Sequence, residues 1–271
     1  MKVAACQMVS GTSLANNLAA AELLVAQAAE AGAELAVLPE YFCLMGLDEH
    51  DKLAIAESPG AGKIQDFLQH CAQRYKLWLV AGTVPLISPE SNKVYNTTLA
   101  WNRLGKRVAR YDKIHLFKFD QGAEHYDESR VITAGAAPVT FDLPSTDGHT
   151  WRVGLSICYD LRFPELYRAL KADLLLVPSA FAHTTGKAHW EVLLRARAVE
   201  NLAYVLAAAQ GGVHDNQRRT WGHSMIVSPW GDVIGQLAQG AGIVLADIEL
   251  SELTKHRGEL PALTHRKVDM Q

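Results

Sequence analysis

The 271-residue sequence is poor in cysteine, and its cysteines form no CxxC pair. Closely spaced cysteine pairs are typical of zinc ribbons, and dense cysteines are typical of disulfide-stapled secreted domains. Their absence argues against both classes, and no metal-ligand spacing is present. The sequence fits a reducing cytoplasm, where cysteine chemistry is free-thiol chemistry. The four cysteines are Cys6, Cys43, Cys71 and Cys158.

The sequence also lacks an excess of charge and a long apolar run. Its net charge is −3 and it has no basic stripe, so no nucleic-acid partner is expected. No apolar run approaches the ~20 residues of a transmembrane helix, so no membrane partner is expected. The short N-terminal apolar stretch is broken by Gln7, which is not typical of a secretory signal. With 49% hydrophobic and 20% charged residues, the chain fits a globular cytoplasmic protein.

Apolar runs that predict buried strands alternate with amphipathic stripes that predict helices. Ser13 is typical of a helix N-cap, Pro164 is typical of a first helical turn, and a helix is expected over 190–201. A hairpin turn is expected at 229–232. Because no linker or repeat interrupts the pattern, we expect one α/β domain over residues 1–271. The periodicity fits either two sheets flanked by helices or a single doubly wound sheet.

The segment VGLSICYDLRFPELY places a cysteine between a predicted strand and a predicted helix. This is the arrangement of a nucleophile elbow, in which a strand end presents the reactive side chain. Cys158 is therefore a candidate nucleophile, and the backbone N–H of Tyr159 is a candidate oxyanion donor. A helix N-terminus and a nearby ammonium group should both lower the thiol pKa. The competing interpretation is a small buried cysteine that packs in the sheet.

Two further charged residues stand at the boundaries of predicted strands. Glu40 follows an apolar run that ends in Pro39, and Lys113 lies in YDKIHL near the start of an apolar segment. Hydrolysis of an amide by cysteine needs a base and a cation, which these two residues would supply. Taken singly, each also fits an exposed residue at a strand end. A histidine base is the alternative, and the histidines nearest to the motifs are His115, His183 and His189.

The ordered motifs LPEYF, YDKIHLF and ICYDLRFPEL resemble the signature of the nitrilase superfamily, and the likeness continues through GHSMIVSPWGDV to the ending HRKVDM. The resemblance implies that Glu40 is the general base, that Lys113 stabilises the intermediate and that Cys158 is the nucleophile. It also implies that Glu128 helps to position the substrate. The implied fold is a four-layer α-β-β-α sandwich that forms homodimers or higher homo-oligomers. The implied chemistry needs no metal and no organic cofactor.

Within that superfamily the chain is similar to Nit-type amidases that hydrolyse deaminated glutathione to 2-oxoglutarate and cysteinylglycine. The segments CYDLRFPEL, PSAF and AHWEVLLRARAVE carry this likeness. The alternative is an ω-amidase that acts on 2-oxoglutaramate or 2-oxosuccinamate. Lys187 stands in an expected loop where relatives of both kinds have proline, so substrate preference stays open. A nitrilase and a non-catalytic scaffold of the same fold are further alternatives. The expected binding partner of the enzyme is a small-molecule amide substrate.

Both keto acid substrates carry a carboxylate, which predicts a cation near the nucleophile. Arg162, four residues after Cys158, is the first candidate. The competing interpretation for Arg162 is a structural ion pair with Asp160 or Glu165. The residues expected to contact substrate are Tyr159, Arg162 and Phe42, although the two aromatic residues also fit a packing role.

Two further arginines on the following predicted helix are also candidates for binding the carboxylate. Arg195 and Arg197 belong to the stretch LLRARAVEN. The competing interpretation is that each forms a structural ion pair, with Glu191 or Glu200 as the partner.

Overall fold

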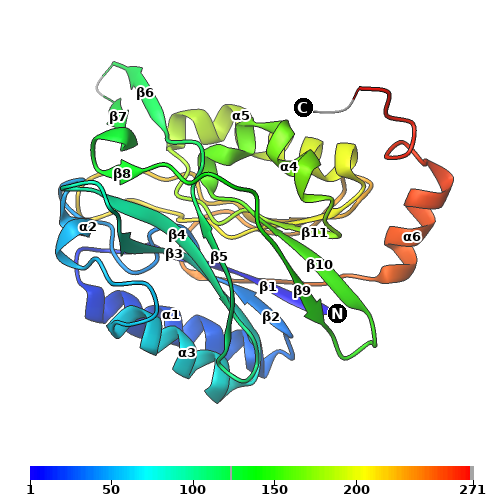
Figure 1. The fold of residues 1–271 in the computed structure, drawn as a ribbon, viewed down its shortest axis with the longest axis horizontal. Coiled ribbons are helices and arrows are strands. Elements are labelled where there is room, and N and C mark those ends of the chain that lie inside the picture. Colours follow the sequence, from blue (N-terminus) through cyan, green and yellow to red (C-terminus); the bar gives the residue numbers. More distant parts are fainter. Residues whose placement is uncertain (123, 269–271) are drawn as a thin grey trace.

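The computed structural model describes residues 1–122 and 124–268, without the side chain of Glu124. Within these residues two β-sheets stack face to face and helices cover their outer faces (Figure 1). This arrangement confirms the expected four-layer sandwich and excludes a single doubly wound sheet. Asp269 and Met270, at the end of the HRKVDM motif, lie outside the described residues.

The first sheet contains both the N-terminal strand and the last strand of the chain. Its strands are β1 (Lys2–Gln7), β2 (Leu35–Val37), β3 (Trp78–Ile87), β4 (Val94–Trp101), β5 (Arg107–Asp112), β8 (Ile132–Thr133) and β15 (Gly242–Asp247). The order is β15-β1-β2-β3-β4-β5, and β8 pairs with β4. β1, β2 and β3 run parallel, whereas β4 is antiparallel to both β3 and β5. β2, β3 and β5 therefore end at the same edge of the sheet.

The second sheet has the order β14-β13-β12-β11-β10-β9. Its strands are β9 (Thr140–Pro144), β10 (Thr150–Leu155), β11 (Leu174–Leu176), β12 (Tyr204–Ala207), β13 (Ser224–Val227) and β14 (Val233–Leu237). The pairing of Val227 with Val233 confirms the hairpin expected around 229–232. A separate hairpin of β6 (Lys118–Gln121) and β7 (Glu124–Asp127) projects from the sandwich (Figure 1).

Helices cover the outer face of each sheet. The helices are α1 (Leu14–Glu30), α2 (Asp51–Ala54), α3 (Lys63–Tyr75), α4 (Pro164–Leu170), α5 (His183–Asn201) and α6 (Leu250–Glu259), with 3-10 turns η1 (Glu128–Arg130) and η2 (Cys158–Arg162). α1 and α3 lie on the first sheet, and α4 and α5 lie on the second (Figure 1). The Ser13 side chain accepts the N–H of Asn16, and Pro164 opens α4, as expected.

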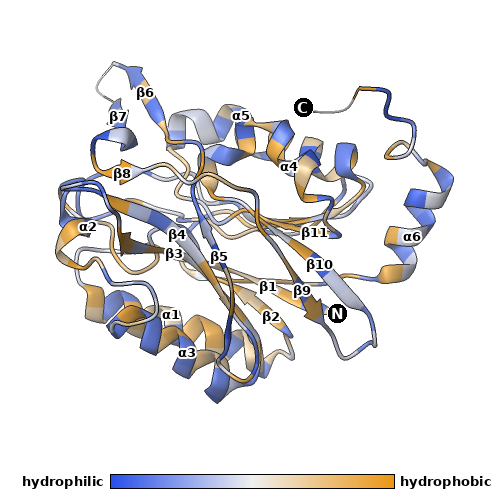
Figure 2. Cartoon of the chain, viewed as in Figure 1, coloured by the Kyte–Doolittle hydropathy of each residue, from blue (hydrophilic) through white to orange (hydrophobic). Residues whose placement is uncertain are grey.

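Apolar side chains fill both sides of each sheet. One buried cluster lies mainly between the sheets and under α4 and α5, and a second lies between the first sheet and α1 and α3. In α1 the buried residues Leu18, Ala21, Val25 and Ala28 recur at helical spacing, so one face of the helix packs on the sheet. The helices accordingly alternate hydrophobic and hydrophilic residues along their length (Figure 2). None of the helices in the described residues has the length and apolar character to cross a bilayer.

Two local features differ from the sequence-based expectation. Helix α5 begins at His183, so Lys187 is an exposed helical residue and does not stand in a loop. Thr-Thr-Gly is a poor helix-forming stretch, but a Cβ at Gly186 would lie 2.3 Å from the Cβ of Trp221. Close packing on Trp221 thus overrides local propensity. The antiparallel pairing of β15 with β1, which joins the two ends of the chain, was not predicted.

Candidate active site

The three residues singled out in the sequence follow strands of different sheets and meet between them. Glu40 follows β2, Lys113 follows β5 and Cys158 follows β10. Nζ of Lys113 lies 2.9 Å from Oε1 of Glu40, and Glu40 and Cys158 line the same small cavity. Strand ends at one sheet edge are a usual place for binding sites because loops there are free to diverge.

Glu40 is held by donors on both carboxylate oxygens. Oε1 accepts hydrogen bonds from Nζ of Lys113 and from Nδ2 of Asn96, each at 2.9 Å. Oε2 accepts the backbone N–H of Ala180, also at 2.9 Å. The side chain is 1% exposed. The carboxylate is therefore fixed in orientation and shielded from bulk water, which suits a base that must act at one position.

Lys113 is buried between two carboxylates. Its Nζ also contacts Glu128, whose Oε2 accepts the Phe117 N–H at 2.7 Å and whose Oε1 accepts the Tyr41 hydroxyl at 2.8 Å. Burial lowers the pKa of Lys113, but the charges of Glu128 and Glu40 outweigh burial, so the pKa is raised above its ordinary value. Lys113 therefore remains a cation next to the thiol.

Cys158 has φ +48, a left-handed conformation that is uncommon for a residue with a side chain. Such strain is frequent at sites where a tight turn must present one side chain. The Cys158 N–H donates to Pro178 O at 2.9 Å, whereas the Tyr159 N–H has no acceptor within the described residues. Tyr159 thus offers a free donor in the first turn of η2, at the place expected for an oxyanion donor.

The thiol pKa differs from the sequence-based expectation. Burial and the charge of Glu40 raise the pKa of Cys158 well above its ordinary value, and Glu128 adds to this rise. Lys113 does lower the pKa, but it does not compensate for the other three causes. The resting thiol is therefore protonated at neutral pH, and it needs a base to accept its proton.

Two glycines allow the strand ends that carry the acid and the cation to approach their neighbours. A Cβ at Gly82 would lie 1.8 Å from Pro39 O, immediately before Glu40. A Cβ at Gly135 would lie 2.0 Å from Asp112 O, immediately before Lys113. Neither backbone position could accept a side chain without moving the segment that carries Glu40 or Lys113. These contacts were not predicted from the sequence, because the paired segments are distant along the chain.

A narrow cavity adjoins Cys158. Its lining is Glu40, Phe117, Glu128, Cys158, Tyr159, Ala180, Phe181, Ala182, Thr185 and Arg218. Within the described residues no histidine belongs to this lining. Nδ1 of His115 instead lies 2.7 Å from Asp160 Oδ1, while His183 lines a cleft outside the cavity and His189 contacts Arg162. The structure thus provides Glu40, and no histidine, beside the thiol.

Of the three residues expected to contact the substrate, one lines the cavity and two do not. Tyr159 lines the cavity. Phe42 does not: it is fully buried in the cluster under α1 and α3, because the chain turns it into the core directly after Tyr41, which has φ +57. Arg162 is absent from the cavity lining; its guanidinium packs against the rings of Tyr159 and Phe181.

The arginines therefore have mainly structural partners. Arg162 contacts His189 and forms no ion pair with Asp160 or Glu165 within the described residues. Arg197 pairs with Glu200 at 2.9 Å and donates to Leu161 O, as the structural interpretation predicts. The other helical arginine lies near Glu191: the Arg195–Glu191 distance is 3.6 Å.

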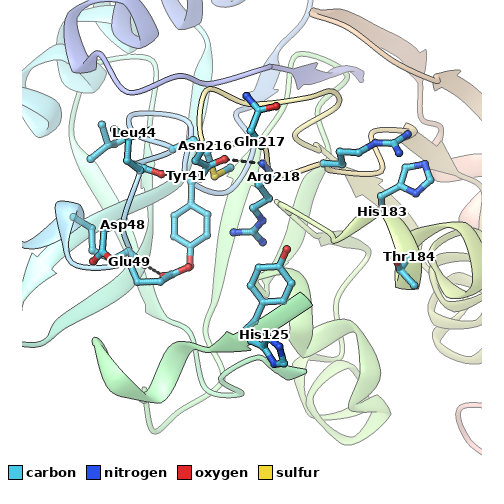
Figure 3. A pocket seen from close by; sticks show the side chains of 16 residues that line it. Tyr41, Leu44, Asp48, Glu49, His125, His183, Thr184, Asn216, Gln217 and Arg218 are labelled. Carbon is cyan, nitrogen blue, oxygen red and sulfur yellow. Dashed lines mark hydrogen bonds and ion pairs between the residues drawn. The ribbon is translucent and has the colours of Figure 1, made fainter. Parts of the chain in front are cut away.

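Sequence analysis missed Arg218, which stands in a loop without a recognisable motif. The residue lines both the Cys158 cavity and a wider outer cleft of about 530 Å³. Figure 3 shows its side chain extending into this cleft beside Tyr41. Nη2 donates to Ala180 O at 3.0 Å. The described residues contain no cluster of three or more His, Cys, Asp or Glu side chains arranged to hold a metal ion.

Comparison with known proteins agrees with this geometry. The carbon-nitrogen hydrolase family matches residues 2–257. A deaminated glutathione amidase from Synechocystis sp. is 42% identical over 269 residues, which cover 97% of each chain. The crystal structure of the Caenorhabditis elegans NitFhit protein superposes with a TM-score of 0.89 at 37% identity, over 98% of this chain and 65% of that chain.

A third relative bears on the chemistry of the site. An amidase from Nesterenkonia sp. AN1, 28% identical with a TM-score of 0.77, covers 96% of this chain and 98% of its own. Its structure shows the result of Michael addition of acrylamide at the active site cysteine. The family match over most of the sequence, the fold and the relatives agree: the chain belongs to the carbon-nitrogen hydrolase family of the nitrilase superfamily and is an amide-hydrolysing enzyme.

Proposed function

We propose that the protein hydrolyses deaminated glutathione through a thioester on Cys158. The observation that carries the mechanism is the buried contact of Lys113 with Glu40, beside the cavity that Glu40 shares with the Cys158 thiol. The relatives named deaminated glutathione amidase, about 40% identical over nearly the whole chain, support the substrate.

The first half of the reaction forms the thioester. Glu40 accepts the thiol proton while Sγ of Cys158 bonds to the amide carbon. The resulting oxyanion is held by Lys113 and by the Tyr159 N–H. When the C–N bond breaks, Glu40 returns the proton to the leaving nitrogen, and the amine departs as cysteinylglycine.

The second half restores the enzyme. Glu40 accepts a proton from water as the hydroxide oxygen attacks the thioester carbon. The C–S bond then breaks, 2-oxoglutarate leaves, and the Cys158 sulfur regains its proton from Glu40. Glu128 acts by holding Lys113 and by closing one side of the cavity.

We also propose that the protein works in the cytoplasm as a homodimer or larger homo-oligomer. Four free cysteines suit a reducing compartment. Apolar residues are exposed on α5 and near the β13–β14 hairpin, and such residues favour association. They are Val192, Val199, Trp230, Val233 and Ile234. Sedimentation equilibrium tests this proposal, and a monomer at micromolar concentration would contradict it.

The decisive experiment measures keto acid formation from deaminated glutathione and from 2-oxoglutaramate side by side. We expect a higher kcat/KM for deaminated glutathione and no turnover by Cys158→Ala. Mass spectrometry of the quenched wild-type reaction should show an acyl group on Cys158. A preference for 2-oxoglutaramate would make the enzyme an ω-amidase, and an acyl-enzyme in Cys158→Ala would refute the assigned nucleophile.

A further inference from the structure

The inner cavity and the outer cleft differ greatly in size. The inner cavity at Cys158 has about 10 Å³ of free space, close to the minimum that one water molecule occupies. The outer cleft has about 530 Å³. A space of this size does not contain a whole substrate, so the part of a substrate beyond the reacting amide group must extend into the cleft. Arg218 is the residue, among those described, that lines both spaces.

The guanidinium of Arg218 is short of acceptors. Nη2 donates to Ala180 O, but the buried Nε has no hydrogen-bond partner in the described residues. No carboxylate lies within ion-pair distance of Arg218 in this part of the chain; Glu49, the nearby acid of the cleft, is paired with Lys52 at 2.6 Å. Burial lowers the pKa of Arg218, but the charges of its neighbours, Glu49 and Glu40 among them, outweigh burial and raise it. Arg218 is therefore a cation whose guanidinium makes no direct contact with a carboxylate of the described residues, so a carboxylate of a ligand can approach it.

The position of this guanidinium is nevertheless well defined. Its central carbon lies 5.0 Å from the centroid of the Tyr126 ring, and the Arg218 backbone N–H donates to Asn216 Oδ1 at 2.9 Å. The Ala180 residue that accepts from Arg218 also donates its N–H to Glu40. Arg218 is therefore held in fixed relation to the base, with N–H groups left for a ligand.

We propose that Arg218 binds the substrate carboxylate and thereby selects anionic amides. A guanidinium presents parallel N–H groups that match the two oxygens of a carboxylate. The inference rests on the proposed function, because it assumes that the substrate enters the cavity amide first. It assigns to Arg218 the role that the sequence suggested for Arg162, whose guanidinium lies against Tyr159 and Phe181 and outside the cavity lining.

The test compares two amides of similar shape, succinamate and 4-methylpentanamide, in which a neutral isopropyl group replaces the carboxylate. Arg218→Gln should lower kcat/KM for succinamate about 10- to 100-fold, the loss expected for a hydrogen bond to a charged group. Activity on the neutral amide should change less than about twofold. Arg218→Lys should recover part of the preference for succinamate, because lysine keeps the positive charge but lacks the parallel N–H groups of the guanidinium.

Arg152→Gln is the matched control, because Arg152 is exposed on β10 and has no side-chain partner within the described residues. Equal losses on both amides in Arg218→Gln, with or without unfolding, would show a structural role and overturn the inference. Unchanged activity on both would also overturn it. If neither amide is hydrolysed, each amide is tested for its ability to protect Cys158 of the wild type from alkylation by iodoacetamide. Protection by succinamate that is no stronger than protection by the neutral amide would refute the inference.

The proposed function can fail separately. The wild type could fail to hydrolyse deaminated glutathione and 2-oxoglutaramate and still prefer succinamate to the neutral amide. If Arg218→Gln abolishes that preference, the proposed substrate is refuted and the role of Arg218 is supported. Turnover of deaminated glutathione that Arg218→Gln does not change would support the proposed substrate and refute the role of Arg218.

Discussion

The Tyr111 hydroxyl donates a 2.7 Å hydrogen bond to Oδ2 of Asp160, and this bond joins the two sheets beneath the active site. Tyr111 lies two residues before Lys113, and Asp160 lies two residues after Cys158. Oδ2 of Asp160 also accepts the Ile157 N–H at 2.9 Å. One buried carboxylate therefore holds the segment with Lys113 and the segment with Cys158 in register.

Tyr111→Phe should destabilise the protein and slow catalysis. The substitution removes a donor from a fully buried carboxylate, which typically costs about 1–3 kcal/mol. Thermal unfolding should show a lower Tm, and kcat should fall. Tyr75→Phe is the control, because it removes a tyrosine hydrogen bond to Glu22 at the surface. Equal decreases of Tm and of kcat in the two variants would contradict a special role for Tyr111.

Glu40→Gln should lower the pKa of Cys158 although it removes activity. Burial is the main cause that raises this pKa, and the charge of Glu40 raises it further. Without that charge, the ultraviolet absorbance of the thiolate should appear at lower pH than in the wild type. Loss of the base should reduce kcat by about 10²- to 10⁴-fold.

The other thiols can be separated from this titration by a difference measurement. Burial raises the pKa of each remaining cysteine to about 12, and these are Cys6, Cys43 and Cys71. Subtracting the curve of the matching variant that also carries Cys158→Ala isolates the signal of Cys158. A thiol pKa that is unchanged or higher in Glu40→Gln would show that Glu40 does not face the sulfur.

Lys113→Met should destabilise the fold strongly, because it leaves Glu40 and Glu128 buried without their shared cation. Breaking a buried pair by removing one partner costs about 3–5 kcal/mol. Adding Glu128→Gln removes one of the two negative charges, so the double variant should regain part of the free energy of unfolding in urea. Turnover should stay absent in both. A double variant that is no more stable than Lys113→Met would contradict this charge balance.

Gly82→Ala should displace the segment that carries Glu40, since the new Cβ would lie 1.8 Å from Pro39 O. We expect a loss of stability of a few kcal/mol and a large fall in kcat. Gly258→Ala is the matched control, because Gly258 lies in α6 with open space around it. That substitution should stabilise the protein slightly, by up to about 1 kcal/mol. Both effects are measured by thermal unfolding and by the amidase assay.

The sequence pattern placed the candidate acid and thiol at the ends of apolar strands and the candidate cation near the start of an apolar segment, and the resemblance of the three ordered motifs to the nitrilase superfamily assigned their roles. Such positions are visible in a single sequence, since burial imposes apolar runs on strands. Sequence reasoning did not find Arg218, because nothing in NQRRTW marks this loop as a neighbour of Cys158. It expected Phe42 at the substrate, whereas a left-handed residue, Tyr41, turns the chain so that Phe42 enters the core.

The amino-acid sequence by itself determined the α/β class, the alternation of strands and helices and the three candidate residues Glu40, Lys113 and Cys158. These features follow from local periodicity and from motifs that each occupy a few consecutive positions. Only the tertiary structure decided the direction of the Cys158 pKa, the role of Gly82 and the place of Arg218 between cavity and cleft. Those properties depend on burial and on charges contributed by segments distant in the chain, and such contacts form only when the two sheets stack.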